Sequence, residues 1–134
     1  MAISVSTVHI TVDDPERALA FYRDALGYEV TNDVENEGFH WITLTSEAQP
    51  GVNLVLSQPE PCRSEEDARA LSELLAKGGL TPVHLRTDDL DGLFARLADV
   101  EGVSVVQEPT DQFWGVRDGA LRDPAGNFLR IEQA

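Results

Sequence analysis

Two histidines occupy equivalent places in two similar segments of this chain. His9 lies in TVHITV, and His84 lies 75 residues later in PVHLRT. An unperturbed imidazole titrates near pH 6.5, so a neutral histidine can accept a proton near physiological pH without help from a metal. His9 and His84 are therefore the candidate general bases, if the protein is a catalyst.

Two arginines, Arg86 and Arg130, suggest a different chemistry. The chain has 10 Lys plus Arg against 24 Asp plus Glu, for a formal net charge of -14. In so acidic a protein, a guanidinium on a binding face favours an anionic group through forked hydrogen bonds. We expect a ligand with a carboxylate, phosphonate or phenolate. The negative charge repels phosphate backbones and anionic membranes, so neither nucleic acid nor a membrane is an expected partner.

The elements that position these residues repeat along the chain. Four landmark pairs share one separation of 75 residues: His9 and His84, Asp14 and Asp89, Gly27 and Gly102, and Gly51 and Gly126. Such self-similarity indicates two copies of one supersecondary unit. With 42% hydrophobic residues, 134 residues suffice for one sizeable core. We expect a single domain over 1–134, made of a module 1–57, a connecting helix within 58–80 and a module 81–134.

Each module is expected to have the order βαβββ. In the first strand, Val8, Ile10 and Val12 form an apolar face and alternate with Thr7, His9 and Thr11. Asp14 and Gly27 bound a helix, and Ser64 with Asp67 forms a capping box for the connecting helix. The other first-module strands are expected at 28–32, 39–45 and 52–56, with turns at 36–38 and 50–51. The second module is expected to have strands at 82–87, 103–107, 114–121 and 128–132, and a helix at 89–98.

Two segments carry a family resemblance: VHITVDDPERALAFYRDALGYEV and RDPAGNFLRIEQ. With them, the chain resembles the vicinal oxygen chelate superfamily, which includes glyoxalases, extradiol dioxygenases, fosfomycin-inactivating enzymes and bleomycin-binding resistance proteins. The resemblance implies an α+β fold in which two tandem βαβββ modules form curved mixed sheets, as half-barrels, around a central cleft. It also implies a homodimer.

The resemblance places metal ligands at four positions of metal-dependent members. Those positions hold Thr7, Val55, Pro82 and Arg130 here. Valine and proline have no side-chain donor atom, and a guanidinium repels a divalent cation. We therefore expect no metal and no other cofactor. The alternative is a displaced site made of His9, His84 and Glu132, a set that suits zinc or iron. Its ligands lie two residues farther along each strand, a shift of roughly 6.5 Å.

The expected binding residues are those that strand alternation places on the concave face, with aromatic walls added. They are Thr7, His9, Trp41, Asn53, Val55, His84, Arg86, Trp114, Phe128, Arg130 and Glu132. His40 falls on the face opposite Trp41 and is left out. A purely structural role also fits several of these residues, since Arg130 can pair with Glu132 or Asp123, and both tryptophans can belong to the core.

We interpret the chain as a cytoplasmic protein that binds an anionic or aromatic small molecule and sequesters it. No apolar run approaches the roughly 18 to 20 residues of a membrane span, and the single cysteine, Cys62, cannot form an internal disulfide. Whether the protein is an enzyme stays open. The alternative is a lyase like lactoylglutathione lyase, an isomerase or a dioxygenase that uses zinc, nickel, manganese or iron. A third interpretation is a protein with only an interaction role.

Overall fold

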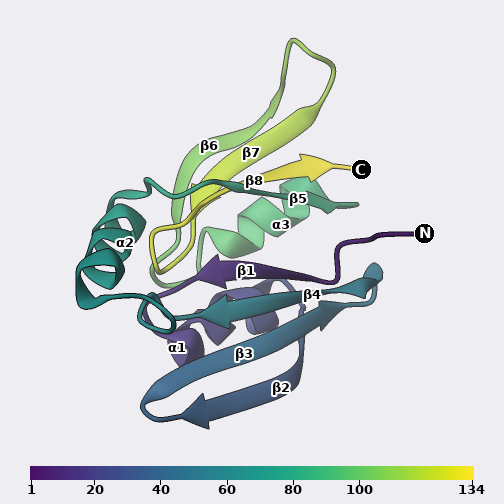
Figure 1. Cartoon of the computed structure of the whole chain (residues 1–134). Helices are drawn as coiled ribbons and strands as arrows, with labels where there is room; N and C mark the ends of the chain where they lie inside the picture. Colours follow the sequence, from purple (N-terminus) through teal and green to yellow (C-terminus); the bar gives the residue numbers. More distant parts are fainter. The chain divides into compact units, whose positions relative to one another are not determined.

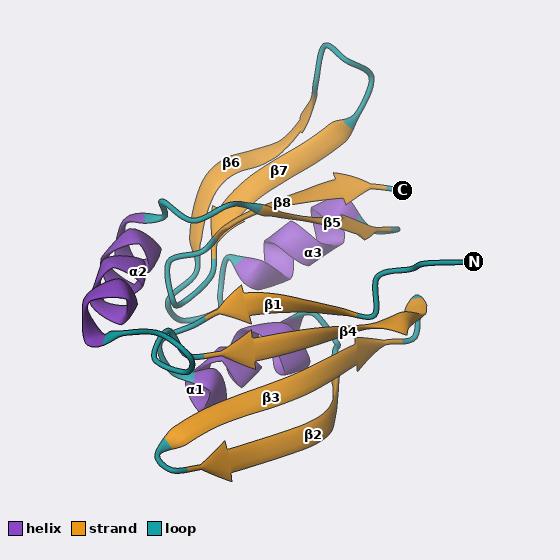
Figure 2. Cartoon of the chain, in the orientation of Figure 1, coloured by secondary structure: helices purple, strands orange, loops and turns teal.

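A computed structural model describes residues 1–134, which divide into two compact units, Met1–Ser72 and Glu73–Ala134. Each unit contains one open, four-stranded mixed sheet (Figures 1 and 2). The α+β class and the repeated βαβββ order predicted from the sequence are confirmed. None of the helices combines the length and the hydropathy that a membrane crossing requires.

The first unit contains the strands β1 (Thr7–Thr11), β2 (Glu29–Asn36), β3 (Phe39–Ser46) and β4 (Gln49–Ser57), in the spatial order β1-β4-β3-β2. Strand β1 is parallel to β4, and the other pairs are antiparallel. Helix α1 (Pro15–Leu19) continues as a π-helical segment, η1 (Ala20–Ala25). The Asp14 side chain accepts hydrogen bonds from the first free amides of α1, and Gly27 follows η1 with φ +85°. The expected start and stop signals of this helix therefore operate.

The core of the first unit lies between its helical segment and one face of its sheet. Phe21 and Tyr22 are fully buried, with their rings edge to face at 4.8 Å between centroids. Ile10, Ile42 and Leu56 are paired neighbours across the sheet, are equally buried and point to the same face. Since α1 contacts β3 and β4, this face is the helix-covered one. The other face of the sheet carries Thr7, His9 and Asn53.

The second unit begins within α2 (Glu65–Lys77), the predicted connecting helix, where Ser64 Oγ accepts from the Asp67 amide at 3.1 Å. Its strands are β5 (Val83–Thr87), β6 (Ser104–Asp111), β7 (Arg117–Arg122) and β8 (Phe128–Gln133), in the order β5-β8-β7-β6. Helix α3 (Leu90–Leu97) packs on β6, β7 and β8 through its buried apolar side chains. A Cβ atom at Gly119 of β7 would lie 2.5 Å from the Phe94 ring, so glycine permits this close packing.

The turn before β8 is held by a buried carboxylate. Asp123 is 2% exposed and accepts hydrogen bonds from the amides of Ala125, Gly126 and Asn127 at 2.8 to 3.0 Å. The Asn127 side chain donates a further bond to Asp123 at 3.0 Å. A carboxylate with this many donors fixes the backbone conformation. The turn therefore sets the register in which β8 presents its side chains.

Several element boundaries differ from the predicted ones. Strand β2 continues to Asn36, because Glu37 and Gly38 alone make the reversal, both with positive φ as a tight hairpin requires. The segment 50–51 lies inside β4 rather than in a turn, because a two-residue hairpin joins β3 to β4 earlier. Val8 was expected on the packed face but is 39% exposed. It lies on β1, an edge strand paired only with β4.

Trp114 was expected in a strand starting at 114, and this expectation was wrong. Strand β7 starts at Arg117, and Trp114 lies in the connection from β6. Gly115 has φ +93° and donates its amide to the Gln112 carbonyl, while the Gln112 amide bonds the Val116 carbonyl at 2.7 Å. These bonds close a turn around Trp114, and 54% of this residue is exposed.

Candidate functional site

The open face of the first sheet gathers the predicted residues of that module. The register pairs Thr7 with Asn53 and His9 with Val55, and it pairs Trp41 with Ser57. Paired residues point to the same side of a sheet, so this group shares the face opposite the helix. His9 is exposed, and its Nδ1 atom lies 3.2 Å from Ser57 Oγ. The Nε2 atom of His9 has no hydrogen bond within the protein.

The open face of the second sheet gathers the predicted residues of the other module except Trp114. His84 pairs with Arg130, and Arg86 pairs with Glu132. Arg86 donates from Nε and Nη2 to one oxygen of Glu132, at 3.1 and 2.8 Å. His84 is exposed. Arg86 and Glu132 therefore form a surface ion pair on this face.

Arg130 is part of a partly buried polar network, which we call the Arg130 network: Gln107, Gln112, Asp118 and Arg130. The Nη1 atom of Arg130 donates to Asp118 Oδ2 at 3.2 Å and, more weakly, to Gln107 Oε1 at 3.5 Å. Gln112 Nε2 donates to Asp118 Oδ1 at 2.8 Å and to Gln107 Oε1 at 3.3 Å. Asp118 is 6% exposed. The sequence had suggested Glu132 or Asp123 as the partner of Arg130. The structure pairs Arg130 with Asp118 instead, because Asp118 is its diagonal neighbour on the adjacent strand β7.

The remaining donors of Arg130 determine what this face can bind. Only Nη1 makes hydrogen bonds within the protein, so Nε and Nη2 remain available as a two-donor edge. The guanidinium carbon lies 5.8 Å from the centroid of the Phe128 ring, and the Arg130 side chain is 31% exposed. An anchored guanidinium beside an aromatic ring can bind a planar carboxylate with little loss of side-chain freedom.

Sequence reasoning missed Asp118, Gln107 and Gln112. Between β1 and β4 and between β5 and β8 the registers match with the 75-residue separation: His9 pairs with Val55, as His84 pairs with Arg130. In the first unit, however, Trp41 pairs with Ser57. The residue equivalent to Ser57 is Glu132, which pairs with Asp118, and Asp118 lies 77 residues after Trp41. This two-residue shift in β7 hides Asp118 from a fixed-separation comparison. The signal that reveals it is the strand register.

Trp114 belongs to an exposed aromatic pair on the connection from β6 to β7. Its ring lies edge to face with that of Phe113, at 4.8 Å between centroids, and 96% of Phe113 is exposed. The pair directly follows Gln112, a member of the Arg130 network. The structure thus places Trp114 at the surface and not in the core.

Two other features include none of the predicted residues. A shallow depression of about 350 Å³ is lined by Gly27, Glu29, Thr45, Ser46 and Glu47. Three potential metal ligands, Glu16, Asp33 and His40, meet on the helix-covered side of the first sheet. His40 and Trp41 are adjacent in β3 and point to opposite faces, as the sequence indicates.

The fold agrees with the comparison to known proteins. The family profile described as Glyoxalase/Bleomycin resistance protein/Dioxygenase superfamily matches residues 4–131. The chain belongs to this superfamily. Two paired βαβββ modules are the architecture that the resemblance implied.

Three individual proteins illustrate the relationship. An uncharacterized protein of Bacillus subtilis, YurT, is 32% identical over 98% of this chain and 99% of its own length. The crystal structure of UcmS2 has 31% identity and a TM-score of 0.86, with all of both chains covered. TnmS3, an antibiotic binding protein from Streptomyces sp. CB03234, has 30% identity and a TM-score of 0.73 over 99% of this chain and 98% of its own.

Proposed function

We propose that this protein binds a small organic molecule with an anionic group on an aromatic body, and that it acts by sequestration rather than by catalysis. The observation that supports the proposal is the hydrogen bonding of the Arg130 guanidinium. Its Nη1 is anchored on buried Asp118, while Nε and Nη2 are left for a ligand on the open face of the second sheet. Phe128 supplies aromatic surface beside it.

The similarity to TnmS3 supports binding as the role, because that relative is an antibiotic binding protein. In our proposal, Arg130 fixes the anionic group, Phe128 contacts the aromatic body, and Gln107 and Gln112 accept or donate further hydrogen bonds. Apolar area supplies affinity in such sites, and a few polar groups fix orientation. His84 and the ion pair of Arg86 with Glu132 border the same face.

The proposal includes no metal at the family's usual positions. Thr7, Val55, Pro82 and Arg130 do not form a ligand set, and the Arg130 guanidinium carries a fixed positive charge. The metal-dependent alternative with His9, His84 and Glu132 is less supported, since Glu132 already accepts two hydrogen bonds from Arg86. The same proposal takes the protein to be a cytoplasmic homodimer without nucleic-acid or membrane partners, in keeping with its charge of -14.

Calorimetric titration with a matched pair of probes tests the proposal. We expect anthraquinone-2-carboxylate to bind at least about tenfold more tightly than the neutral anthraquinone-2-carboxamide, because a charge-assisted pair with Arg130 contributes about 1.5 to 3 kcal/mol. The two probes share one ring system, so the difference reports the anionic group alone. Equal affinities, or no heat from either probe, would contradict the proposed ligand class.

A further inference from the structure

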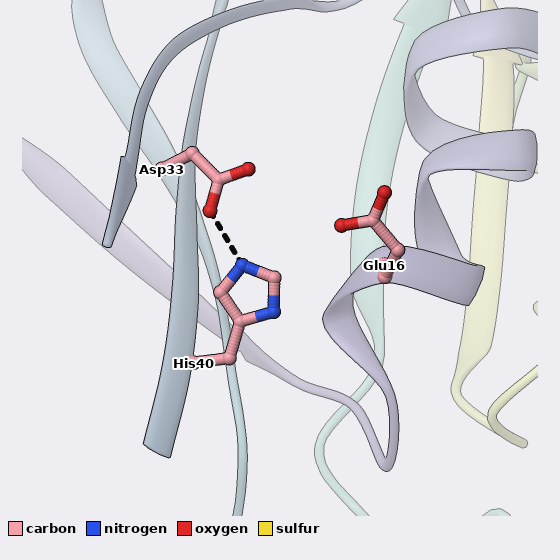
Figure 3. A group of neighbouring side chains, drawn as sticks. All are labelled: Glu16, Asp33 and His40. Atoms are coloured by element: carbon pink, nitrogen blue, oxygen red, sulfur yellow. Dashed lines mark hydrogen bonds and ion pairs between the residues drawn. The ribbon is translucent and has the colours of Figure 1, made fainter. Parts of the chain in front are cut away.

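We propose that Glu16, Asp33 and His40 form a binding site for a divalent transition-metal ion of the zinc class. The three residues come from α1, β2 and β3 of the first unit (Figure 3). One ligand atom from each lies within 4.8 Å of the others. The site lies on the helix-covered side of the sheet, away from the face that carries Trp41 and His9, and it does not depend on the proposed ligand-binding function.

The backbone fixes the three residues before any ion binds. Asp33 pairs with Ile42, two residues after His40, so Asp33 and His40 are diagonal neighbours on one face of the β2–β3 hairpin. The His40 amide donates to Gln58 Oε1 at 3.0 Å, which fixes the strand at this point. Glu16 lies in the first turn of α1, and its amide donates to the Asp14 cap at 3.1 Å. A fixed backbone lowers part of the entropy cost of ion binding, and the exposed side chains of Glu16 and Asp33 supply the rest of that cost.

The charges favour a cation at this position. His40 Nε2 lies 2.5 Å from Asp33 Oδ1, whereas the Glu16 carboxylate interacts with the exposed Arg23 guanidinium through coulombic attraction. In Figure 3 the Glu16 carboxylate extends from the helix toward the imidazole, opposite the hairpin that carries Asp33. Two carboxylates converge on one imidazole, and the exposed Arg23 is a further positive group that acts on Glu16. A divalent ion would offset both negative charges and replace the bond between His40 and Asp33.

The ligand types narrow the choice of metal. Zinc binds imidazole nitrogen and carboxylate oxygen at about 2.0 to 2.2 Å, whereas calcium and magnesium prefer oxygen alone. The ligand atoms lie within 4.8 Å of one another, whereas tetrahedral zinc with bonds of about 2.0 to 2.2 Å requires ligand atoms roughly 3.3 to 3.6 Å apart, so the side chains would have to move together when the ion binds. Glu16 and Asp33 are exposed, so water can complete the coordination. Because the ion would join the start of α1 to the hairpin, we infer a stabilising role for it, not a catalytic one.

Zinc titration of the chelator-treated full-length protein tests this site. We expect one Zn²⁺ per chain by calorimetry and a higher unfolding temperature with zinc, because the ion binds only the folded form. Glu16→Gln, Asp33→Asn and His40→Gln should each weaken binding by at least about tenfold. The matched control is the double variant His9→Gln/His84→Gln, which removes the other histidines of the chain and should bind zinc as the wild type does.

Nuclear magnetic resonance of the imidazole nitrogens identifies the ligand in the unaltered protein. The chain has three histidines, and only the signals of His40 should shift when zinc is added. Absence of zinc binding at millimolar concentration would overturn the proposal. So would full binding by Glu16→Gln, which would reduce the group to an ion pair between His40 and Asp33. Loss of binding in the His9→Gln/His84→Gln control alone would also overturn it and would instead support the displaced metal site.

Discussion

Arg130→Ala is expected to weaken the binding of anthraquinone-2-carboxylate by roughly 10- to 100-fold, the equivalent of one lost charge-assisted bidentate contact. The reason is that the nitrogen atoms of the guanidinium have different partners. Nη1 is held by Asp118 at 3.2 Å, and Nε with Nη2 face no acceptor in the protein. Calorimetry measures the change, and the carboxamide probe should lose much less affinity than the carboxylate.

The control for this variant is Arg117→Ala. Arg117 lies on the neighbouring strand, β7, and forms ion pairs with Asp91 and Asp111, but it does not belong to the Arg130 network. Its removal should leave probe affinity unchanged. Removal of Arg130 leaves Asp118 buried without its cation, which costs about 1 to 3 kcal/mol of stability, so thermal unfolding must show that the variant is folded. The double variant Arg130→Ala/Asp118→Asn relieves that cost and should bind as weakly. Wild-type affinity in a folded Arg130→Ala variant would rule out the site.

Gly126→Ala is expected to reduce the free energy of unfolding by about 2 to 5 kcal/mol, through backbone strain and steric overlap together. Gly126 has φ +110°, and an added Cβ would lie 2.4 Å from the Leu75 carbonyl oxygen of α2. A backbone oxygen cannot rotate away as a flexible side chain can. The turn held by Asp123 would have to shift, and with it the start of β8. Urea denaturation measures the loss.

The repeat itself provides the control, Gly51→Ala. Gly51 is the residue equivalent to Gly126 in the 75-residue repeat, yet a Cβ there would meet nothing within 4 Å, and its φ lies outside the left-handed region. We expect a change of less than about 0.5 kcal/mol, typical of an exposed position. Equal losses of stability in the two variants would show that the turn before β8 is not packed closely against helix α2.

The sequence predicted the fold well because the determinants of the fold are local and occur twice. Alternation in 7–12, the Asp14 cap and Gly27 define the β1–α1 unit, and the equivalent signals at Asp89 and Gly102 define the second. Gly27 and Gly102 have nearly the same φ, +85° and +86°. Matching residues here have matching backbone requirements, so a comparison at fixed separation succeeds.

The candidate site was less predictable because its contacts depend on register and packing. The two-residue shift of β7 places Asp118 where a fixed 75-residue separation predicts Val116, so the anchor of Arg130 was missed. The group of Glu16, Asp33 and His40 was missed for another reason. Alternation correctly assigned His40 to the face opposite Trp41, but which helical side chain reaches that face depends on how α1 packs across the hairpin. No local pattern encodes that packing.

The most direct test of the central claim is a titration of chelator-treated protein with anthraquinone-2-carboxylate, repeated after Zn²⁺ is added. The account predicts the same affinity in both titrations, because Arg130 of the second unit binds the anion directly and the proposed metal site at His40 belongs to the first unit. It also predicts that His9→Gln/His84→Gln binds the probe without a metal requirement. Binding that appears only with metal, and that is lost in this double variant or in Glu132→Gln, would contradict the account and identify a metal-dependent site instead.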